Sequence, residues 1–310
     1  MSEAVNTGIL YTEHSSLRSV SLGVSSLWSY ESRSYGGQRP VAVNADGDEE
    51  YWLDRSDPLL NTILPGTGVS LVVNLDEPWT AGRTLVSSAF VPRLAVIGPV
   101  MYSRILRLGN SVRAFGAGLE STLTREVFGV PAAELVDQIA PLEDLWNRLE
   151  IERLIATFAS ADPRQSISVL RNEMTARIGR LAGEDPFGRT VPALVKLQGG
   201  QMSINHLAES HGLKRQQFKR RFLAATGLSP KTYARLTRFQ ALVHSLLSTD
   251  VSSWVAVSSD VGFYDQAHMI NEFHEFAGSS PTVLFQPHGS EGGSVKLKLR
   301  GRPSEWSRLS

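Results

Sequence analysis

Two stretches of the sequence repeat one pattern, and this repeat limits the fold more than any other feature. AESHGLKRQQFKRRFLAATGLSP (208–230) and SSDVGFYDQAHMINEFHEFAGSSP (258–281) each contain a glycine, an apolar residue, an amphipathic segment and a final Gly-x-Ser-Pro. Corresponding residues are 50 apart at first and 51 apart after a one-residue insertion, as in the pairs Gly212 and Gly262, Gln216 and Gln266, and Pro230 and Pro281. The chain therefore contains two copies of one supersecondary unit.

Each copy predicts a helix-turn-helix. The short segments 204–211 and 254–261 have helical patterns and end near a glycine, which suits the left-handed conformation that stops one helix before another begins at a steep angle. Between the copies, a continuous helix is expected from Thr232 to Leu247, about 24 Å long at 1.5 Å per residue. Such a spacer can place two recognition helices about 34 Å apart, one turn of B-DNA, so the spacing favours DNA as the ligand.

The formal net charge is zero, with 31 basic and 31 acidic residues, but the charges are segregated. Residues 1–195 hold 17 basic and 23 acidic side chains, whereas 196–238 hold nine basic side chains and one acid, Glu209. A charge run by itself more often marks a solvated helix face than a binding site. Here the cations lie within a patterned helical segment, so we expect DNA phosphates to bind mainly through 196–238.

The second helix of the first copy separates apolar from polar residues. Phe218 and Phe222 form its apolar stripe, and the remaining surface carries the residues that we predict to bind DNA: Arg215, Gln216, Lys219, Arg220 and Arg221. Glutamine can pair with adenine, and arginine or lysine with guanine, in the major groove. One helix-turn-helix pattern is often mimicked by other helical hairpins, whereas two in tandem are much more specific.

At these residues the chain resembles the AraC/XylS family of transcription regulators, over about residues 190–286. The resemblance rests on MSINHLAESHGLKRQQFKRRFLAATGLSPKTYARLTRFQAL and on GFYDQAHMINEFHEFAGSSP. It implies a DNA-binding domain of seven helices, binding of both units of one monomer to an asymmetric half-site, and RNA polymerase as a partner at the promoter.

The resemblance also implies contact residues in both units. By position these are Gln216, Lys219 and Arg220 in the first unit, and Gln266, Ile270 and Asn271 in the second. The chain departs from the family where Asn271 and His274 stand in place of the usual Arg and Lys. We therefore expect weaker or more sequence-adaptive binding in the second unit, through neutral side chains that include His268. Ordinary surface histidines are the alternative interpretation of His268 and His274, and whether this unit reads bases stays open.

The first half of the chain has a different pattern. Residues 15–130 contain short alternating and apolar runs bounded by Pro and Gly, which predict several strands in a barrel or sandwich. Apolar residues at helical spacing then predict a hairpin of two helices, over 142–158 and 163–181. These helices either close the core of the first domain or form the seam of a homodimer. The fold class is thus α+β, with a β-rich, barrel-like domain and helical hairpin followed by an all-α tandem helix-turn-helix domain.

Four segments are expected along the chain. Residues 1–182 form a sensor domain, GEDPFGRTVP (183–192) a linker, 193–286 the DNA-binding domain, and 287–310 a flexible basic tail that adds non-specific phosphate affinity.

The first domain more loosely resembles a sensor region found in a subset of these regulators. ILPGTGVSLVVNL (63–75) and VFGVPAAELVDQIAPLEDLWNRL (127–149) carry this resemblance. Gly66 and Thr67 stand where that region often has an Asp, so any role of that carboxylate does not transfer. The resemblance supplies no ligand. Candidates for lining an effector pocket are Trp28, Trp52 and Trp79, for which aromatic core packing is the alternative.

Other chemistry is disfavoured by composition and spacing. Absence of Cys excludes disulfides, thiolate metal sites and Cys nucleophiles, and only His14 of the seven histidines precedes residue 196. The pair Gly116 and Gly118 lacks the other residues of a phosphate loop, and turn geometry is the preferred explanation. We expect no metal, no cofactor and no catalytic residues. Neither a signal peptide nor a long apolar run is found, so a cytoplasmic protein without a membrane partner is expected.

The favoured function is an effector-responsive transcription regulator that reads two successive major grooves of double-stranded DNA. One alternative is a small-molecule enzyme tethered to DNA by the same C-terminal domain. Another is a protein-interaction module tethered in the same way. The effector, the operator and the sign of regulation are not determined by the sequence.

Overall fold

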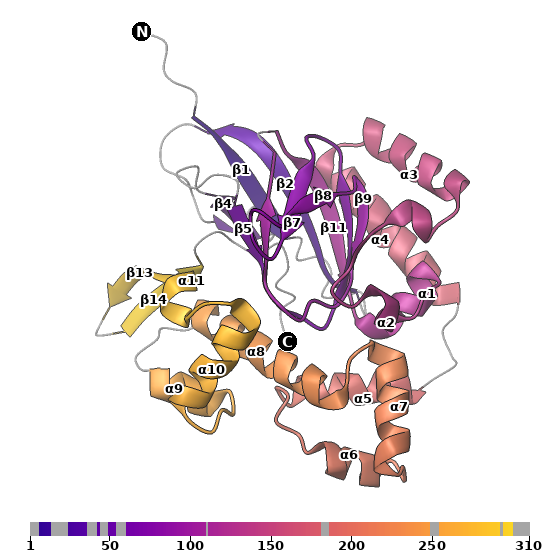
Figure 1. Cartoon of the computed structure of the whole chain (residues 1–310). Coiled ribbons are helices and arrows are strands. Elements are labelled where there is room, and N and C mark those ends of the chain that lie inside the picture. Colours follow the sequence, from indigo (N-terminus) through magenta and orange to yellow (C-terminus); the bar gives the residue numbers. More distant parts are fainter. Residues whose placement is uncertain are drawn as a thin grey trace.

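The computed structural model describes residues 6–13, 24–35, 42–43, 49–53, 60–109, 111–180, 186–248, 254–291 and 294–299. Within these ranges a β-rich region precedes a helical region, and the two pack against each other (Figure 1). This order of elements confirms the predicted α+β class.

The β-rich region contains two antiparallel sheets. The larger has the order β12-β9-β6-β11-β2-β1-β4-β3, and the smaller has the order β5-β10-β7-β8. The strands are β1 (Asn6–Glu13), β2 (Val24–Tyr35), β3 (Ala42–Val43), β4 (Glu49–Leu53), β5 (Leu60–Ile63), β6 (Val69–Asn74), β7 (Trp79–Gly82), β8 (Ala89–Val91), β9 (Leu94–Ile97), β10 (Arg104–Arg107), β11 (Arg113–Leu119) and β12 (Ile139–Pro141).

Each face of the larger sheet has its own core, because successive side chains of a strand point to opposite faces. Trp28 of β2 packs with Trp79 and residues of both sheets, whereas its neighbour Leu27 packs with residues of the helices. Gly116 lies inside β11, and a Cβ at this position would be 2.0 Å from the Trp28 ring. The turn expected at Gly116 is therefore wrong: the glycine makes room for an indole.

Helices cover the second face of the larger sheet. They are α1 (Thr124–Phe128), α2 (Ala132–Leu135), α3 (Arg148–Ser160) and α4 (Pro163–Arg180), with the 3-10 turns η2 (Ser121–Leu123) and η3 (Leu142–Asp144). The apolar side of α4, including Met174, is buried against β2 and β11. The hairpin thus closes the first core, as the first of the two interpretations expects. Leu149 of α3 does not join this core and is 78% exposed.

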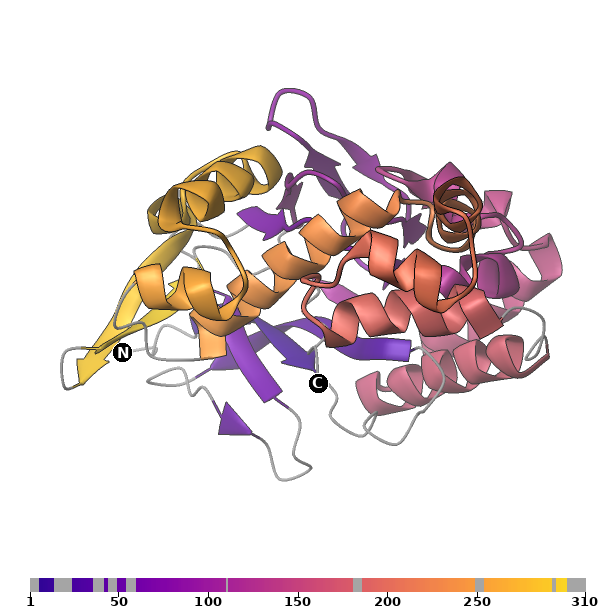
Figure 2. The ribbon, with the colours of Figure 1, turned by 90° about the horizontal axis from the view of Figure 1, so that it is seen from below.

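The helical region contains α5 (Pro186–Leu197), α6 (Ile204–Ser210), α7 (Arg215–Thr226), α8 (Pro230–Ser248), α9 (Trp254–Asp260), α10 (Gln266–Ala277) and α11 (Pro281–Leu284). The helix pairs α6 and α7, and α9 and α10, are the two predicted helix-turn-helix units. Helix α8 runs between them as one continuous helix (Figure 2).

The repeat is confirmed, but one of its pairings is wrong. Helices α7 and α10 both have 12 residues, and both end at a left-handed glycine, Gly227 with φ 75° and Gly278 with φ 73°. Since α7 begins at Arg215 and α10 at Gln266, these two residues correspond, and Gln216 does not correspond to Gln266. The inserted residue lies in the turn between the helices of the second unit, before the helix rather than within it.

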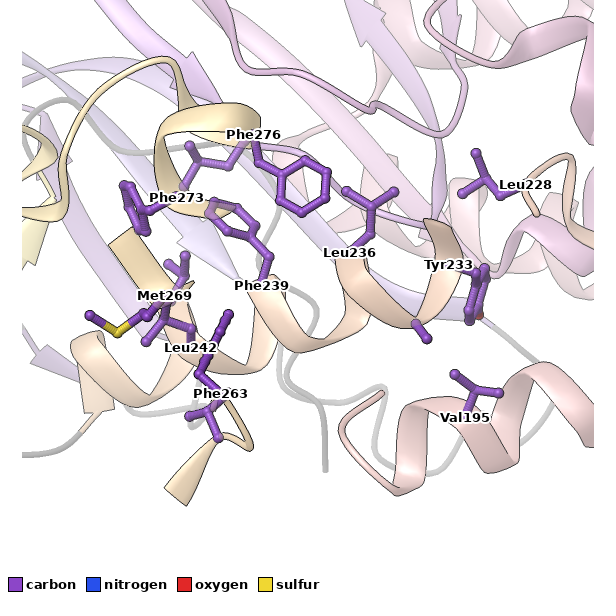
Figure 3. Close-up of a cluster of buried hydrophobic side chains, with 14 of the residues drawn as sticks. Val195, Leu228, Tyr233, Leu236, Phe239, Leu242, Phe263, Met269, Phe273 and Phe276 are labelled. Atoms are coloured by element: carbon purple, nitrogen blue, oxygen red, sulfur yellow. The ribbon is translucent and has the colours of Figure 1, made fainter. Parts of the chain in front are cut away.

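The core of the helical region is rich in aromatic side chains. Phe239 of α8 lies 5.2 Å from Phe273 and 5.5 Å from Phe276 of α10, measured between ring centroids (Figure 3). At the other end of α8, Tyr233 lies 5.2 Å from Phe222 of α7. Helix α8 therefore shares buried rings with both units.

Two expected irregular segments are ordered. Of the linker predicted at 183–192, residues 183–185 lie outside the described residues, and Pro186 begins α5, where Phe187 and Val191 are buried. A proline is compatible with the first turn of a helix, so the Pro and Gly content misled the prediction.

The expected flexible tail also has structure as far as Leu299. Strands β13 (Phe285–Glu291) and β14 (Ser294–Leu299) pair as an antiparallel hairpin. The run SVKLKL alternates apolar and polar residues, a strand pattern that the glycines and serines around it obscured. Residues 300–310 lie outside the described residues.

Candidate nucleic-acid interface

Helix α7 presents polar side chains on one side because its other side is buried. Phe218 and Phe222 are fully buried, and the Phe218 ring lies 5.5 Å from Phe187 of α5. Arg215, Gln216, Lys219 and Arg220 are all exposed on the remaining surface. The structure thus brings four of the five residues predicted for the first unit onto one exposed surface.

A groove of about 750 Å³ adjoins this surface. The first residues of α6 and α8 form its other sides, and its lining residues are Ser203, Ile204, Asn205, Arg215, Gln216, Lys219, Arg220, Leu223, Ser229, Pro230 and Lys231. Four of these side chains are cationic. A groove of this composition suits a polyanion whose phosphates follow one another along a backbone. Lys231, which follows the Ser229-Pro230 start of α8, lines the groove although no sequence pattern singles it out.

Three other cations of the basic segment, Lys196, Arg235 and Arg238, form ion pairs that hold the fold together. Lys214, the N-cap residue of α7, is exposed. Lys196 Nζ lies 2.6 Å from Glu120 Oε2, and Arg238 Nη2 lies 3.4 Å from Glu272 Oε1. Arg235 binds Glu272 at 2.6 Å and Glu275 at 2.5 Å.

Arg221 also differs from its four predicted companions. Its guanidinium lies 4.2 Å from the centre of the Phe187 ring, a cation–π contact with α5. The sequence-level count of nine basic residues therefore overstates the charge available to DNA, which is concentrated on α7 and Lys231.

The ion pairs perturb several pKa values. Hydrogen bonds to Glu275 and Glu272 raise the pKa of Arg235 despite its partial burial, and the same contact with Arg235 lowers the pKa of Glu275. Burial alone would lower the pKa of Lys196, but the attraction of Glu120, the attraction of Tyr233 and the hydrogen bond to Glu120 together outweigh burial, and the pKa is raised. Burial raises the pKa of the neighbouring Tyr233 to about 12. All these groups keep their neutral-pH charge state.

The residues of α10 that are predicted to contact DNA are uncharged apart from the titratable ring of His268. Asp265 caps α10, since its Oδ1 accepts a hydrogen bond from the backbone N–H of His268 at 2.7 Å. Asn271 is exposed, and Gln266, His268 and Ile270 are half-buried.

His268 is engaged within its own unit. Its Nδ1 accepts a hydrogen bond from the backbone N–H of Tyr264 at 3.4 Å, its ring lies 5.4 Å from the Phe263 ring, and its Nε2 lies 3.6 Å from Glu272. Tyr264 lies in the turn before α10 and is 92% exposed. The sequence pattern does not mark it as a contact residue, because the pairing of Gln216 with Gln266 leaves the inserted residue of this turn out of view.

The candidate effector residues divide into two groups. Trp28 and Trp79 are buried in the core between the two sheets, so aromatic core packing, the alternative, describes them. Trp52 lies in β4, and its side chain is outside the described part of the structure. Among the described residues, no group of three or more His, Cys, Asp or Glu side chains is arranged to hold a metal. None of the helices in the described ranges is both long enough and apolar enough for a membrane span.

Two helix-turn-helix units on one continuous helix, one of them with an exposed cationic surface, define a DNA-binding transcription regulator. Residues 207–286 match the profile of a helix-turn-helix domain family of the AraC type, so the chain carries an AraC-type DNA-binding domain.

Solved structures with a related arrangement include two of ToxT from Vibrio cholerae. An apo variant has 9% sequence identity and a TM-score of 0.43, covering 73% of this chain and 90% of the other. Wild-type ToxT with a bound unsaturated fatty acid has 8% identity and a TM-score of 0.42, covering 73% and 92%. The search of curated proteins finds no match.

Proposed function

We propose that the chain is an effector-responsive transcription regulator that reads two successive major grooves, with α7 as the main electrostatic anchor. One observation supports this most: Arg215, Lys219 and Arg220 are exposed beside a groove and have no carboxylate partner among the described residues. Exposed cations with no intramolecular partner are available for phosphates and for guanine edges.

Each of the two regions has its own proposed function. The β-rich region with α1 to α4 is the sensor, and the region from α5 onward binds DNA in the cytoplasm. Gln266, Ile270 and Asn271 of α10 supply the second set of contacts. Dimerisation and contact with RNA polymerase remain expectations from the family resemblance.

Selection of bound fragments from random duplex DNA tests the proposal. A recovered motif with two elements about one helical turn apart supports reading by both units, because each recognition helix occupies one major groove. A motif with one element assigns sequence reading to the first unit alone. Binding to heparin as tight as to any duplex would overturn the proposal.

A thermal-shift screen tests the sensor role separately. A metabolite that binds the folded chain stabilises it by mass action, so a reproducible rise in Tm supports a small-molecule effector. Indifference to a broad panel favours a signal from a partner protein, the alternative reading of this domain.

A further inference from the structure

The β-rich region contacts both recognition helices, and it does so at their C-terminal ends. Ser103, between β9 and β10, reaches the end of α10 twice: its backbone N–H donates to the carbonyl of Phe276 at 2.9 Å, and its Oγ donates to the carbonyl of Ala277 at 2.8 Å. The last carbonyls of a helix have no partner within the helix. Ser103 therefore satisfies groups that define the position and direction of α10.

The end of α7 is held by close packing instead. A Cβ at Gly227 would lie 2.7 Å from the backbone of Ala132 and of Ala133 in α2. Gly227 also has a φ of 75°, which favours glycine. Helix α2 thus lies directly against the end of α7, as Figure 1 also shows.

The segment that carries Ser103 is itself fixed to the sheets. Val100 pairs with Gly66 through backbone hydrogen bonds of 2.8 and 3.0 Å, and the Met101 N–H donates to Asp137 Oδ1 at 2.9 Å. Asp137 has a φ of 55°, a strained conformation for a residue other than glycine, and Arg104 donates to its carbonyl. The segment before Ser103 is therefore held by contacts with the β-rich region as well as by the contact of Ser103 with α10.

Two ion pairs also join the β-rich region to α5. Besides the pair of Lys196 and Glu120, Arg189 of α5 binds Glu126 of α1 at 2.6 Å. Leu64 of the β-rich region belongs to the core of the helical region, and Met101 packs against that core. The β-rich region thus contacts the helical region at α5, at the end of α7 and at the end of α10.

This docking leaves the DNA-reading side chains accessible. Arg215, Gln216 and Lys219 lie in the first half of α7, and Gln266 and Asn271 in the first half of α10. The contacts of α10 with Ser103 and of α7 with α2 described above are made at the last turn of each helix or at the residue after it. The two helices are held at one end and exposed near the other.

We propose that the β-rich region sets the relative placement of the two recognition helices for DNA, and that Ser103 is the positioning residue for α10. The inference rests on the proposed function, because it concerns how the two units engage one operator together. Ordering both helices before binding removes an entropic cost that DNA binding would otherwise include. The docked region thereby favours simultaneous binding of both units to one duplex. An effector that shifts the 99–103 segment would change the affinity for that duplex.

Ser103→Ala and a matched control test the role of the hydroxyl. Ser111→Ala removes a hydroxyl that donates to Asp76 at the same distance, 2.8 Å, away from α10. Affinities are measured for a selected duplex that contains both elements and for a shortened duplex that contains only the element of the first unit. We expect S103A to lose several-fold in affinity for the full duplex and nothing for the shortened one, and S111A to match the unaltered chain on both. Equal affinities of S103A and the unaltered chain for the full duplex would overturn the inference.

A reversible cross-link tests the same contact without depending on one hydrogen bond. The chain has no cysteine, and a Cβ at Gly278 would lie 3.9 Å from Ser103 Oγ, so the double variant Ser103→Cys with Gly278→Cys contains a single pair within reach of a disulfide. Backbone strain at position 278 is common to the oxidised and reduced forms and cancels in their comparison. We expect the oxidised form to bind the full duplex at least as tightly as the unaltered chain and more tightly than the reduced form.

Weaker binding by the oxidised form than by the reduced form would show that docking opposes DNA binding and would overturn the inference. Failure of the proposed function gives a different result: the unaltered chain itself would not prefer the selected duplex over a scrambled one.

Discussion

The first helix-turn-helix unit exposes cations on its recognition helix, whereas the cations next to the second recognition helix are paired with its carboxylates. Lys219 and Arg220 of α7 face solvent, while Arg235 and Arg238, which lie next to α10, belong to α8 and bind Glu272. At the positions of α10 that correspond to Lys219 and Arg220 stand Ile270 and Asn271. One fold thus leaves positive charge exposed on one recognition helix and pairs it with carboxylates beside the other.

The largest effect should come from breaking the buried charges of the second unit. Glu272→Ala leaves Arg235 and Arg238 without their shared partner, and the loss of one member of a buried pair costs about 3 kcal/mol. The free energy of unfolding from urea denaturation measures this cost. Arg221→Ala, at the corresponding position of α7, is the matched control and should cost about 1 kcal/mol or less, because Arg221 is exposed and a cation–π contact at an exposed site contributes about that much. Equal costs would contradict the contrast between the units.

The next largest effect concerns DNA. Lys219→Ala or Arg220→Ala should weaken binding by about 1–3 kcal/mol and reduce the salt dependence by about one released counterion each. Affinity measured over a series of salt concentrations gives both quantities. Because neither side chain has an ion-pair partner in the part of the chain that the structure describes, the urea midpoint should stay unchanged, which separates the loss of binding from a loss of folding.

Asn271→Ala tests the same comparison of the two units on the second recognition helix. No charge is removed, so the salt slope should remain that of the unaltered chain while the preference at one base position declines. A slope reduced as much as in Lys219→Ala would show that the second unit anchors DNA electrostatically and would remove the distinction between the units.

The smallest effect is a pH dependence. Arg235 lowers the pKa of Glu275 in the folded state, so this carboxylate contributes stability above its unfolded pKa and loses it as the pH falls through the lower folded value. Since Glu275 is about half exposed, the contribution is small. Urea midpoints between pH 7 and pH 3 should fall less steeply in Glu275→Gln than in the unaltered chain. Identical slopes would show that the pair contributes nothing to the second unit.

Local patterns predicted most of the helical region. The Gly-x-Ser-Pro repeats, the apolar stripe of Phe218 and Phe222, and the uninterrupted periodicity of α8 each depend on residues close in sequence, and all three were confirmed. Gln216 and Gln266 were paired wrongly because an insertion in a turn leaves no periodic signal. The linker and tail were misjudged from composition, which does not reveal that Phe187 has an aromatic partner or that β13 and β14 pair.

The sequence by itself determined the two helix-turn-helix units, the helix between them and the excess of basic residues around the first, since helical periodicity and charge count are local properties. Only the tertiary structure decided which of those basic residues are available to DNA. Lys196, Arg235 and Arg238 look the same in the sequence as Lys219, but their carboxylate partners lie between 34 and 76 residues away along the chain. The same holds for Ser103, whose contact with α10 spans 174 residues and exists only because the two regions pack together.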